Sequence, residues 1–137
     1  MRRLKSVVSI MLLFVYGCNT SPEIKKTDPL ESGRGFIEAS LKGNYDDAEK
    51  YLLRDSTNID YFEGMKEFNS KQSDKEKQSY RDANIIIDSI EKINDSASVI
   101  NYYNTYKMKP SRLKMVKRNS EWLVDFKYTF AESMMDK

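Results

Sequence analysis

The sequence predicts an α+β fold in which N-terminal helices pack on a curved, four-stranded antiparallel meander. Two observations support this prediction. Between residues 29 and 83, apolar side chains recur at helical spacing. From residue 84 the period changes to two, and β-branched and aromatic residues become frequent. Short turns separate four such runs, as is typical of strands joined by hairpins.

Residues 1–17 have the pattern of an export signal. A cationic start precedes an apolar run over residues 7–16, which is too short for a membrane span of about 20 residues. The run ends at Gly17, followed by Cys18, the only cysteine of the chain. This segment resembles a bacterial lipoprotein signal, which implies cleavage before Cys18 and lipid on that residue. The other interpretation of Cys18 is an ordinary free or buried thiol.

The resemblance also implies a location and a division of the chain. Acyl chains anchor a protein because each buried CH₂ contributes about 0.8 kcal/mol. Asn19 stands where an aspartate retains lipoproteins in the inner membrane of some bacteria, so we expect the cell envelope and its outer membrane. Residues 18–28 would then be the lipidated cysteine and a flexible tether, residues 29–130 a single domain, and residues 131–137 a tail.

Charge and composition argue against several classes of function. The chain has 23 Lys and Arg against 21 Asp and Glu, for a net charge of +2. Without residues 1–17 the balance is 20 against 21, so the excess of basic residues belongs to the signal and predicts no nucleic-acid partner. The absence of histidine removes Ser-His and Cys-His catalysis and His-ligated zinc or haem. We therefore expect no cofactor and no metal.

The first helix is predicted over residues 29–41. Asp28 suits the N-cap position and Pro29 the first helical position. Gly33 and Gly35 lie inside this helix, where each glycine costs up to about 1 kcal/mol relative to alanine. These glycines either weaken the first turns or permit close packing.

Further helical segments follow. Gly43 has the character of a helix terminator and Asn44 that of the next N-cap. A third helix is expected to begin near Asn58. Ser73 and Glu76 form a capping box that would open either a short solvated helix or a loop.

Four strands are predicted in the second half of the chain, over residues 84–93, 96–106, 112–117 and 122–128. The first two would be joined by a two-residue turn at Asn94-Asp95. Alternation is clearest in the last run, where every second residue is apolar. Its inward side chains are expected to share a core with the helices; the residues concerned are Trp122, Val124, Phe126, Phe36, Ile37 and Leu52.

Residues 35–48 (GFIEASLKGNYDDA) and residues 116–124 (VKRNSEWLV) form two familiar motifs. The first is similar to the helix–turn–helix opening of nuclear-transport-factor-2-like domains, which have a cystatin-like fold, and the second resembles their closing hairpin. The resemblance implies a sheet wrapped around helices and enclosing a cone-shaped cavity. In that family the cavity holds ligands in some members, performs chemistry in a few and is filled in others.

No catalytic residue emerges from the sequence. The ketosteroid-isomerase type of this family uses a tyrosine on the first helix, but Phe36 and Ile37 occupy that region here. Asn101 and Tyr103, on one face of the second strand, are the best polar candidates for a pocket wall. Aromatic strand residues are more often part of the core, however, and Tyr102 lies on the opposite face.

A modification pattern is also present. Ser96 and Ser89 each follow an aspartate and precede an apolar residue, which resembles an O-glycosylation triplet of some Gram-negative bacteria. Turn chemistry alone also accounts for Asp95-Ser96.

The sequence leaves two functions open. The favoured one is a lipid-anchored, non-catalytic module that contacts the membrane through Cys18 and binds a small apolar ligand or an envelope protein. The alternative is an isomerase or dehydratase acting in the cavity. Its acid would have to be a buried Asp or Glu, because histidine is absent.

Overall fold

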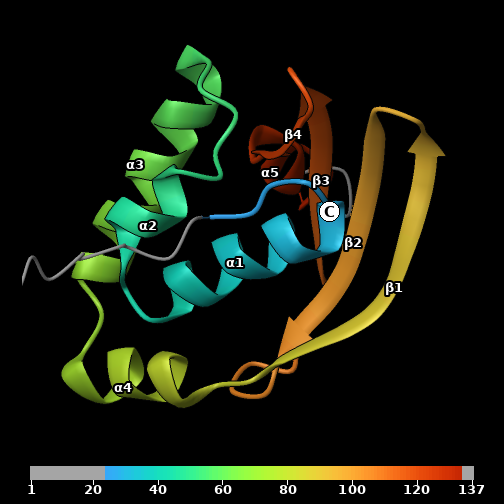
Figure 1. Ribbon diagram of the computed structural model, residues 1–137. Helices are drawn as coiled ribbons and strands as arrows, with labels where there is room; N and C mark the ends of the chain where they lie inside the picture. The colour runs from blue at the N-terminus through green and yellow to red at the C-terminus, as the bar shows by residue number, and fades with distance from the viewer. Residues whose placement is uncertain (1–23, 134–137) are drawn as a thin grey trace, which may run out of the picture.

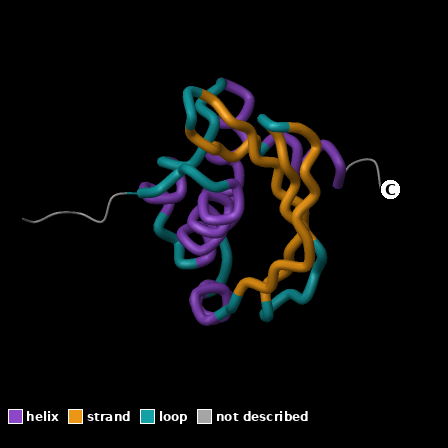
Figure 2. The backbone as a smooth tube through the Cα atoms, turned by 45° about the vertical axis from the view of Figure 1, so that its right-hand side comes forward, coloured by secondary structure: helices purple, strands orange, loops and turns teal. Residues whose placement is uncertain are grey.

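The computed structural model describes residues 24–133, with side chains up to Ala131, and confirms the α+β class (Figure 1). The described elements are α1 (Pro29–Leu41), α2 (Tyr45–Glu49), α3 (Ser56–Ser70), α4 (Asp74–Asp82), β1 (Ile85–Asn94), β2 (Ala97–Asn104), β3 (Ser111–Arg118), β4 (Glu121–Asp125) and α5 (Lys127–Ser133). The strands form one open antiparallel sheet in the order β1-β2-β3-β4. Helices α1 to α4 lie on one side of this sheet, and β1 and β2 curve toward them (Figures 1 and 2).

Helix α1 has the bounds that the sequence predicts, because both of its ends are capped. At its start, Asp28 Oδ1 accepts hydrogen bonds from the backbone N–H groups of Leu30 (2.9 Å) and Glu31 (3.0 Å). At its end, Gly43 has a φ of +74° and donates to the Ser40 carbonyl oxygen. This is a Schellman ending, in which glycine is favoured because the backbone is left-handed.

The two glycines inside α1 permit close packing, one of the two interpretations above. A Cβ atom at Gly33 would collide with the Ile100 side chain and crowd the Met115 sulfur at 3.2 Å. A Cβ atom at Gly35 would collide with the ring of Tyr51. Helix α1 therefore approaches the sheet on one face and the segment after α2 on another.

The predicted core is confirmed. Trp122, Val124 and Phe126 are buried in one cluster with Phe36, Ile37 and Leu52 from the helical layer. The ring centroids of Phe36 and Phe126 lie 5.3 Å apart, and Phe62 packs edge-on to Phe126 at 6.2 Å. Such tilted contacts between rings add to the free energy gained by burying their area.

The chain just after α2 covers the β4 edge of the sheet. Leu52 forms a parallel bridge with Val124; the Val124 N–H donates to the Tyr51 oxygen (2.8 Å), and the Leu53 N–H donates to the Val124 oxygen (2.9 Å). Lys26 adds a further contact, since its carbonyl oxygen accepts from the Trp122 N–H at 2.8 Å. Strand β1 forms the opposite edge of the sheet.

The structure corrects the end of the last strand. Strand β4 stops at Asp125, so Tyr128 lies in a helix, and part of the predicted tail belongs to α5. The cause is a contact with a residue that is distant in sequence. The backbone N–H of Lys127 donates to Asn58 Oδ1 at 2.7 Å, and the chain leaves the hydrogen-bond ladder of the sheet at this point. Phe130 then stacks on Tyr61 of α3, with centroids 5.0 Å apart.

The structure also corrects the first hairpin by one residue. The turn is Asp95-Ser96 rather than Asn94-Asp95, because Asn94 ends β1 and its Oδ1 accepts from the Ser96 N–H at 2.8 Å. The last hairpin turns at Asn119 and Ser120, both with positive φ (49° and 67°), as a type I′ turn requires.

Candidate functional site

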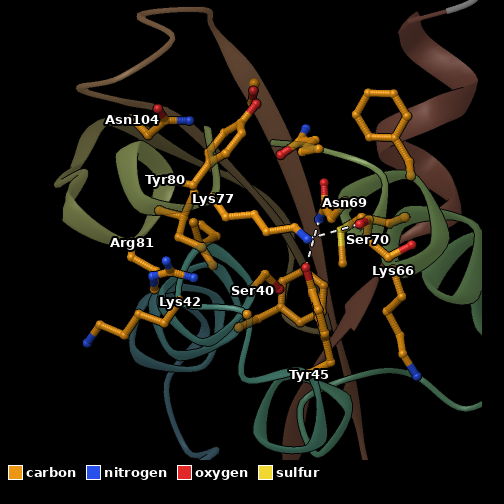
Figure 3. Close-up of a pocket in the computed structure, with 18 of the residues that line it drawn as sticks. Ser40, Lys42, Tyr45, Lys66, Asn69, Ser70, Lys77, Tyr80, Arg81 and Asn104 are labelled. Atoms are coloured by element: carbon orange, nitrogen blue, oxygen red, sulfur yellow. Dashed lines mark hydrogen bonds between the residues drawn. The ribbon is translucent and has the colours of Figure 1, made fainter. Parts of the chain in front are cut away.

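A cavity of about 540 Å³ lies between the helical layer and the end of the sheet where β2 stops and β3 begins (Figure 3). Its wall comes from α1, the turn into α2, the C-terminal half of α3, α4, β2 and β3. The lining includes Phe36, Ile37, Ser40, Leu41, Lys42, Tyr45, Met65, Lys66, Phe68, Asn69, Ser70, Lys77, Tyr80, Arg81, Tyr102, Asn104, Ser111 and Phe126.

The inner wall of the cavity is apolar. Phe36, Ile37 and Phe126 are core residues whose outer surface forms its floor. Met65 and Phe68 follow on α3, and Phe68 is 67% exposed, the largest exposed fraction among the large apolar side chains of the described residues. An exposed aromatic ring at the mouth of an apolar cavity offers surface that a bound molecule can cover.

Helix α4 creates the hollow by standing away from the core. Its start is fixed by the predicted capping box: Ser73 Oγ accepts from the Glu76 N–H (3.2 Å), and Glu76 Oε2 accepts from the Ser73 N–H (3.1 Å). None of its residues is fully buried. The helix therefore closes one side of the cavity without filling it, while Lys77, Tyr80 and Arg81 face inward at helical spacing (Figure 3).

Several neutral polar groups line the same space. Asn69 Nδ2 donates to the Tyr45 hydroxyl at 3.0 Å, tying α3 to α2. Burial raises the pKa of Tyr102 to about 12, against the opposing effect of a hydrogen bond with Ser111, so its hydroxyl stays protonated at neutral pH. Ser40 Oγ is buried and has no hydrogen-bond partner among the described residues.

The charged groups of the lining are all cationic. Lys42, Lys66, Lys77 and Arg81 contribute positive charge, and the lining includes no Asp or Glu. A hydrogen bond to Glu63 at 2.9 Å raises the pKa of Lys66. This arrangement can hold an apolar body and an anionic group, but it presents no carboxylate as a general acid or base.

The structure corrects the predicted pocket wall. Asn101 and Tyr103 lie outside the cavity, whereas Tyr102 and Asn104 of the same strand line it. Asn101 instead donates to Ser89 Oγ (2.9 Å) and Glu91 Oε1 (2.6 Å) on the outer face of the sheet. The face of β2 that points toward the helices is the one that carries Ile100, which is fully buried under α1 beside Gly33.

The remaining predicted sites lie elsewhere. Ser89 is exposed on β1 and accepts from Asn101, while Ser96 is exposed in the turn that follows β1. Cys18 and the signal segment lie outside the described residues.

Sequence reasoning missed the cationic face of α4, because the segment after Ser73 offered only Tyr80 as a large apolar residue. A signal was present: Lys77, Tyr80 and Arg81 have the i, i+3, i+4 spacing that places them on one helix face. It also missed Asn58, which is fully buried and joins α3 to the end of β4. Nothing local to Asn58 indicates that role.

No family model, curated protein or solved structure matches this chain. Among residues 24–133, no helix is long and apolar enough to cross a membrane. The same residues contain no cluster of three or more His, Cys, Asp or Glu side chains placed to hold a metal ion.

Proposed function

We propose that this protein is a non-catalytic binding module of the bacterial cell envelope, anchored by lipid at Cys18, whose cavity takes a small apolar ligand. The observation that carries the binding part is the open cavity with its apolar floor of Phe36, Ile37 and Phe126. The anchor rests on the signal-like pattern of residues 1–18. The proposed location is the outer membrane, because Asn19 rather than an aspartate follows Cys18.

The dimensions of the cavity support ligand binding. Pockets that bury small molecules measure roughly 300–1,000 Å³ and are mostly apolar with a few polar groups. A cavity of about 540 Å³ lies within this range. We further propose that the domain is nuclear-transport-factor-2-like and the cavity its cone. The curvature of β1 and β2 toward α1 supports this (Figure 1).

The enzyme alternative finds less support. It needs a buried carboxylate with a shifted pKa in the cavity. Asp125 is the buried acid of the described residues, but it lies outside the cavity lining. Its Oδ1 pairs with Lys127 Nζ at 2.8 Å and accepts from Asn58 Nδ2 at 3.2 Å. Its role there is structural, which favours binding over acid–base catalysis.

The cavity is tested with the full chain and a neutral, environment-sensitive apolar fluorophore. Phe68→Ala removes ring surface that the ligand would cover, so we expect affinity to fall about tenfold, the equivalent of about 1.4 kcal/mol. Ile93→Ala is the control, because Ile93 is also exposed (55%) but lies outside the cavity. Equal affinities for wild type and both variants would contradict binding in this cavity.

The anchor is tested by mass spectrometry and membrane fractionation of the protein made in a bacterial host. We expect a chain that begins at Cys18, carries acyl groups and partitions with membranes. Cys18→Ala should abolish acylation and either release the protein or leave the signal uncleaved. An intact Met1 and an unmodified Cys18 thiol would refute the anchor and leave the cavity proposal standing.

A further inference from the structure

The polar part of the cavity has an unbalanced charge. Four of its lining residues are cationic, namely Lys42, Lys66, Lys77 and Arg81, and none is acidic. Lys66 differs from the other three because Glu63, one turn away on α3, pairs with it at 2.9 Å. Its charge is therefore matched by a carboxylate outside the cavity.

The other three cations have no carboxylate partner among the described residues. Lys77 Nζ donates to the carbonyl oxygen of Ser70 at 3.0 Å, which is a neutral acceptor. Arg81 donates from Nε (3.3 Å) and Nη2 (2.9 Å) to Oε1 of Gln78, again a neutral group. The ammonium of Lys42 forms neither an ion pair nor a hydrogen bond within the described part of the chain.

The acids of a neighbouring hollow do not cancel this charge. Glu38 and Asp82 line a second, smaller hollow that shares Lys42 and Arg81 with the cavity. Arg34 lines that hollow as well, so three cations face two acids there. A positive excess therefore remains on the side of the cavity where α1 meets α4.

The three cations lie beside the apolar wall rather than apart from it. Figure 3 shows Lys42 and Arg81 on one side of the cavity, whereas the Lys77 side chain extends from α4 toward Ser70 on the other side. Lys42 and Arg81 line both hollows together, so their like charges repel and an anion placed between them relieves that repulsion. The guanidinium of an arginine also matches the geometry of a carboxylate or a phosphate.

We propose that the ligand is a small amphiphile with a single anionic head group. The head would lie at Arg81, with Lys42 on one side and Lys77 on the other, and the apolar tail against Met65 and Phe126. The head group can be the carboxylate of a fatty acid or the phosphate of a lipid ester, which share this chemistry. The inference rests on the proposed function and deepens it by naming the class of ligand.

The experiment compares three photoreactive amphiphiles of equal chain length on the full chain: dodecanol, dodecanoate and dodecyl phosphate, each with a diazirine in the tail. Occupancy is measured as labelling of peptides from the cavity wall at equal free aqueous concentration. We expect at least one anionic probe to bind roughly tenfold tighter than dodecanol at low salt, the range of a charge-assisted hydrogen bond. This advantage should shrink as salt is raised, and whichever anion binds tighter identifies the source of the ligand.

Charge variants locate the head group. In the double variant Lys77→Gln with Arg81→Gln, the anionic probes should bind within about twofold of dodecanol measured on the same variant. Lys75→Gln is the matched control, because Lys75 is exposed on the same helix but does not line the cavity. Unfolding curves of all variants verify that the fold persists.

The outcomes separate the two proposals. If dodecanol and both anionic probes label the cavity with equal affinity, the charge inference fails and the proposed function stands. An equal loss in Lys75→Gln and in the double variant also overturns the charge inference. If none of the three probes labels the cavity, both proposals fail.

Discussion

The two ends of the interface between helices and sheet are built differently, although α1 runs along both. At one end Phe36 of α1 and Phe62 of α3 interlock with Phe126, and the space is filled. At the other end, one helical turn further along α1, Ser40 and Leu41 face a cavity. The difference lies in the packing, because aromatic rings interlock at the filled end, whereas at the hollow end the wall includes α4, none of whose residues is fully buried.

This contrast shows which end of the interface contributes most to the stability of the fold. The filled end contains the fully buried side chains, among them Phe62, Leu52 and Val124. The hollow end is closed by α4, which buries none of its residues. Such an element contributes little to global stability and is free to present side chains to a ligand.

The largest expected effect comes from making the same substitution at two positions of α3, one in its middle and one near its C-terminus. Phe62→Ala removes a 1% exposed ring from the core and should lower the free energy of unfolding by about 3–5 kcal/mol. Phe68→Ala, on the same helix but 67% exposed, should change it by less than about 0.5 kcal/mol. Denaturant unfolding of the two variants measures both values, and similar losses would show that the hollow end is not hollow.

The next effect concerns Asn58, which is fully buried at the filled end. Its Nδ2 donates to Asp55 (2.9 Å) and Asp125 (3.2 Å), and its Oδ1 accepts from the Lys127 N–H. Asn58→Ala leaves these groups without their partner, so we expect a loss of about 2–3 kcal/mol. Unchanged hydrogen exchange at the Lys127 amide would contradict the assigned bond.

A pair of changes along α1 sharpens the comparison. Gly33→Ala should destabilise the fold by about 1–2 kcal/mol, because the collision with Ile100 outweighs the gain in helix propensity. Ser40→Ala should be neutral or stabilising by up to about 1 kcal/mol, since it removes an unpartnered hydroxyl. Thermal unfolding of both variants tests the pair. If Ser40→Ala proved less stable than Gly33→Ala, the assignment of filled and hollow ends would be refuted.

The smallest effect is a pH dependence. The backbone N–H of Asn58, and then Lys127, lower the pKa of Asp55 below its ordinary value. The stabilisation is complete above the unfolded-state pKa and is lost as the pH falls through the lower folded value. It is small, because the Asp55 side chain is 40% exposed and its ion pair is screened. An NMR titration should show the lowered pKa in the wild type and a value closer to normal in Lys127→Gln, which removes the hydrogen bond and the positive charge that act on Asp55.

Local patterns predicted much of the fold because the residues responsible are close in sequence. Asp28 and Gly43 set the bounds of α1, and the alternation of Trp122, Val124 and Phe126 identified their common face. The end of β4 could not be predicted in this way. It depends on the bond from Lys127 to Asn58, which are 69 positions apart.

The residues that line the cavity could not be predicted. Residues 96–106 carry aromatic side chains on both faces, so periodicity alone does not decide which face meets the helices. The approach of α1 at Gly33 over Ile100 decides it, and therefore Tyr102 rather than Tyr103 lines the cavity. That approach depends on tertiary packing between residues far apart in sequence.

The most direct test of the central claim, that the hollow end is a ligand pocket, is native mass spectrometry of the full-length gene product purified in lipid nanodiscs from cells that make it. We predict that part of the wild-type protein carries a small molecule that leaves on gentle activation, unlike covalently attached acyl groups. Phe68→Ala, purified in the same way, should carry much less of it. A wild-type protein that carries no such molecule, like the variant, would contradict the account.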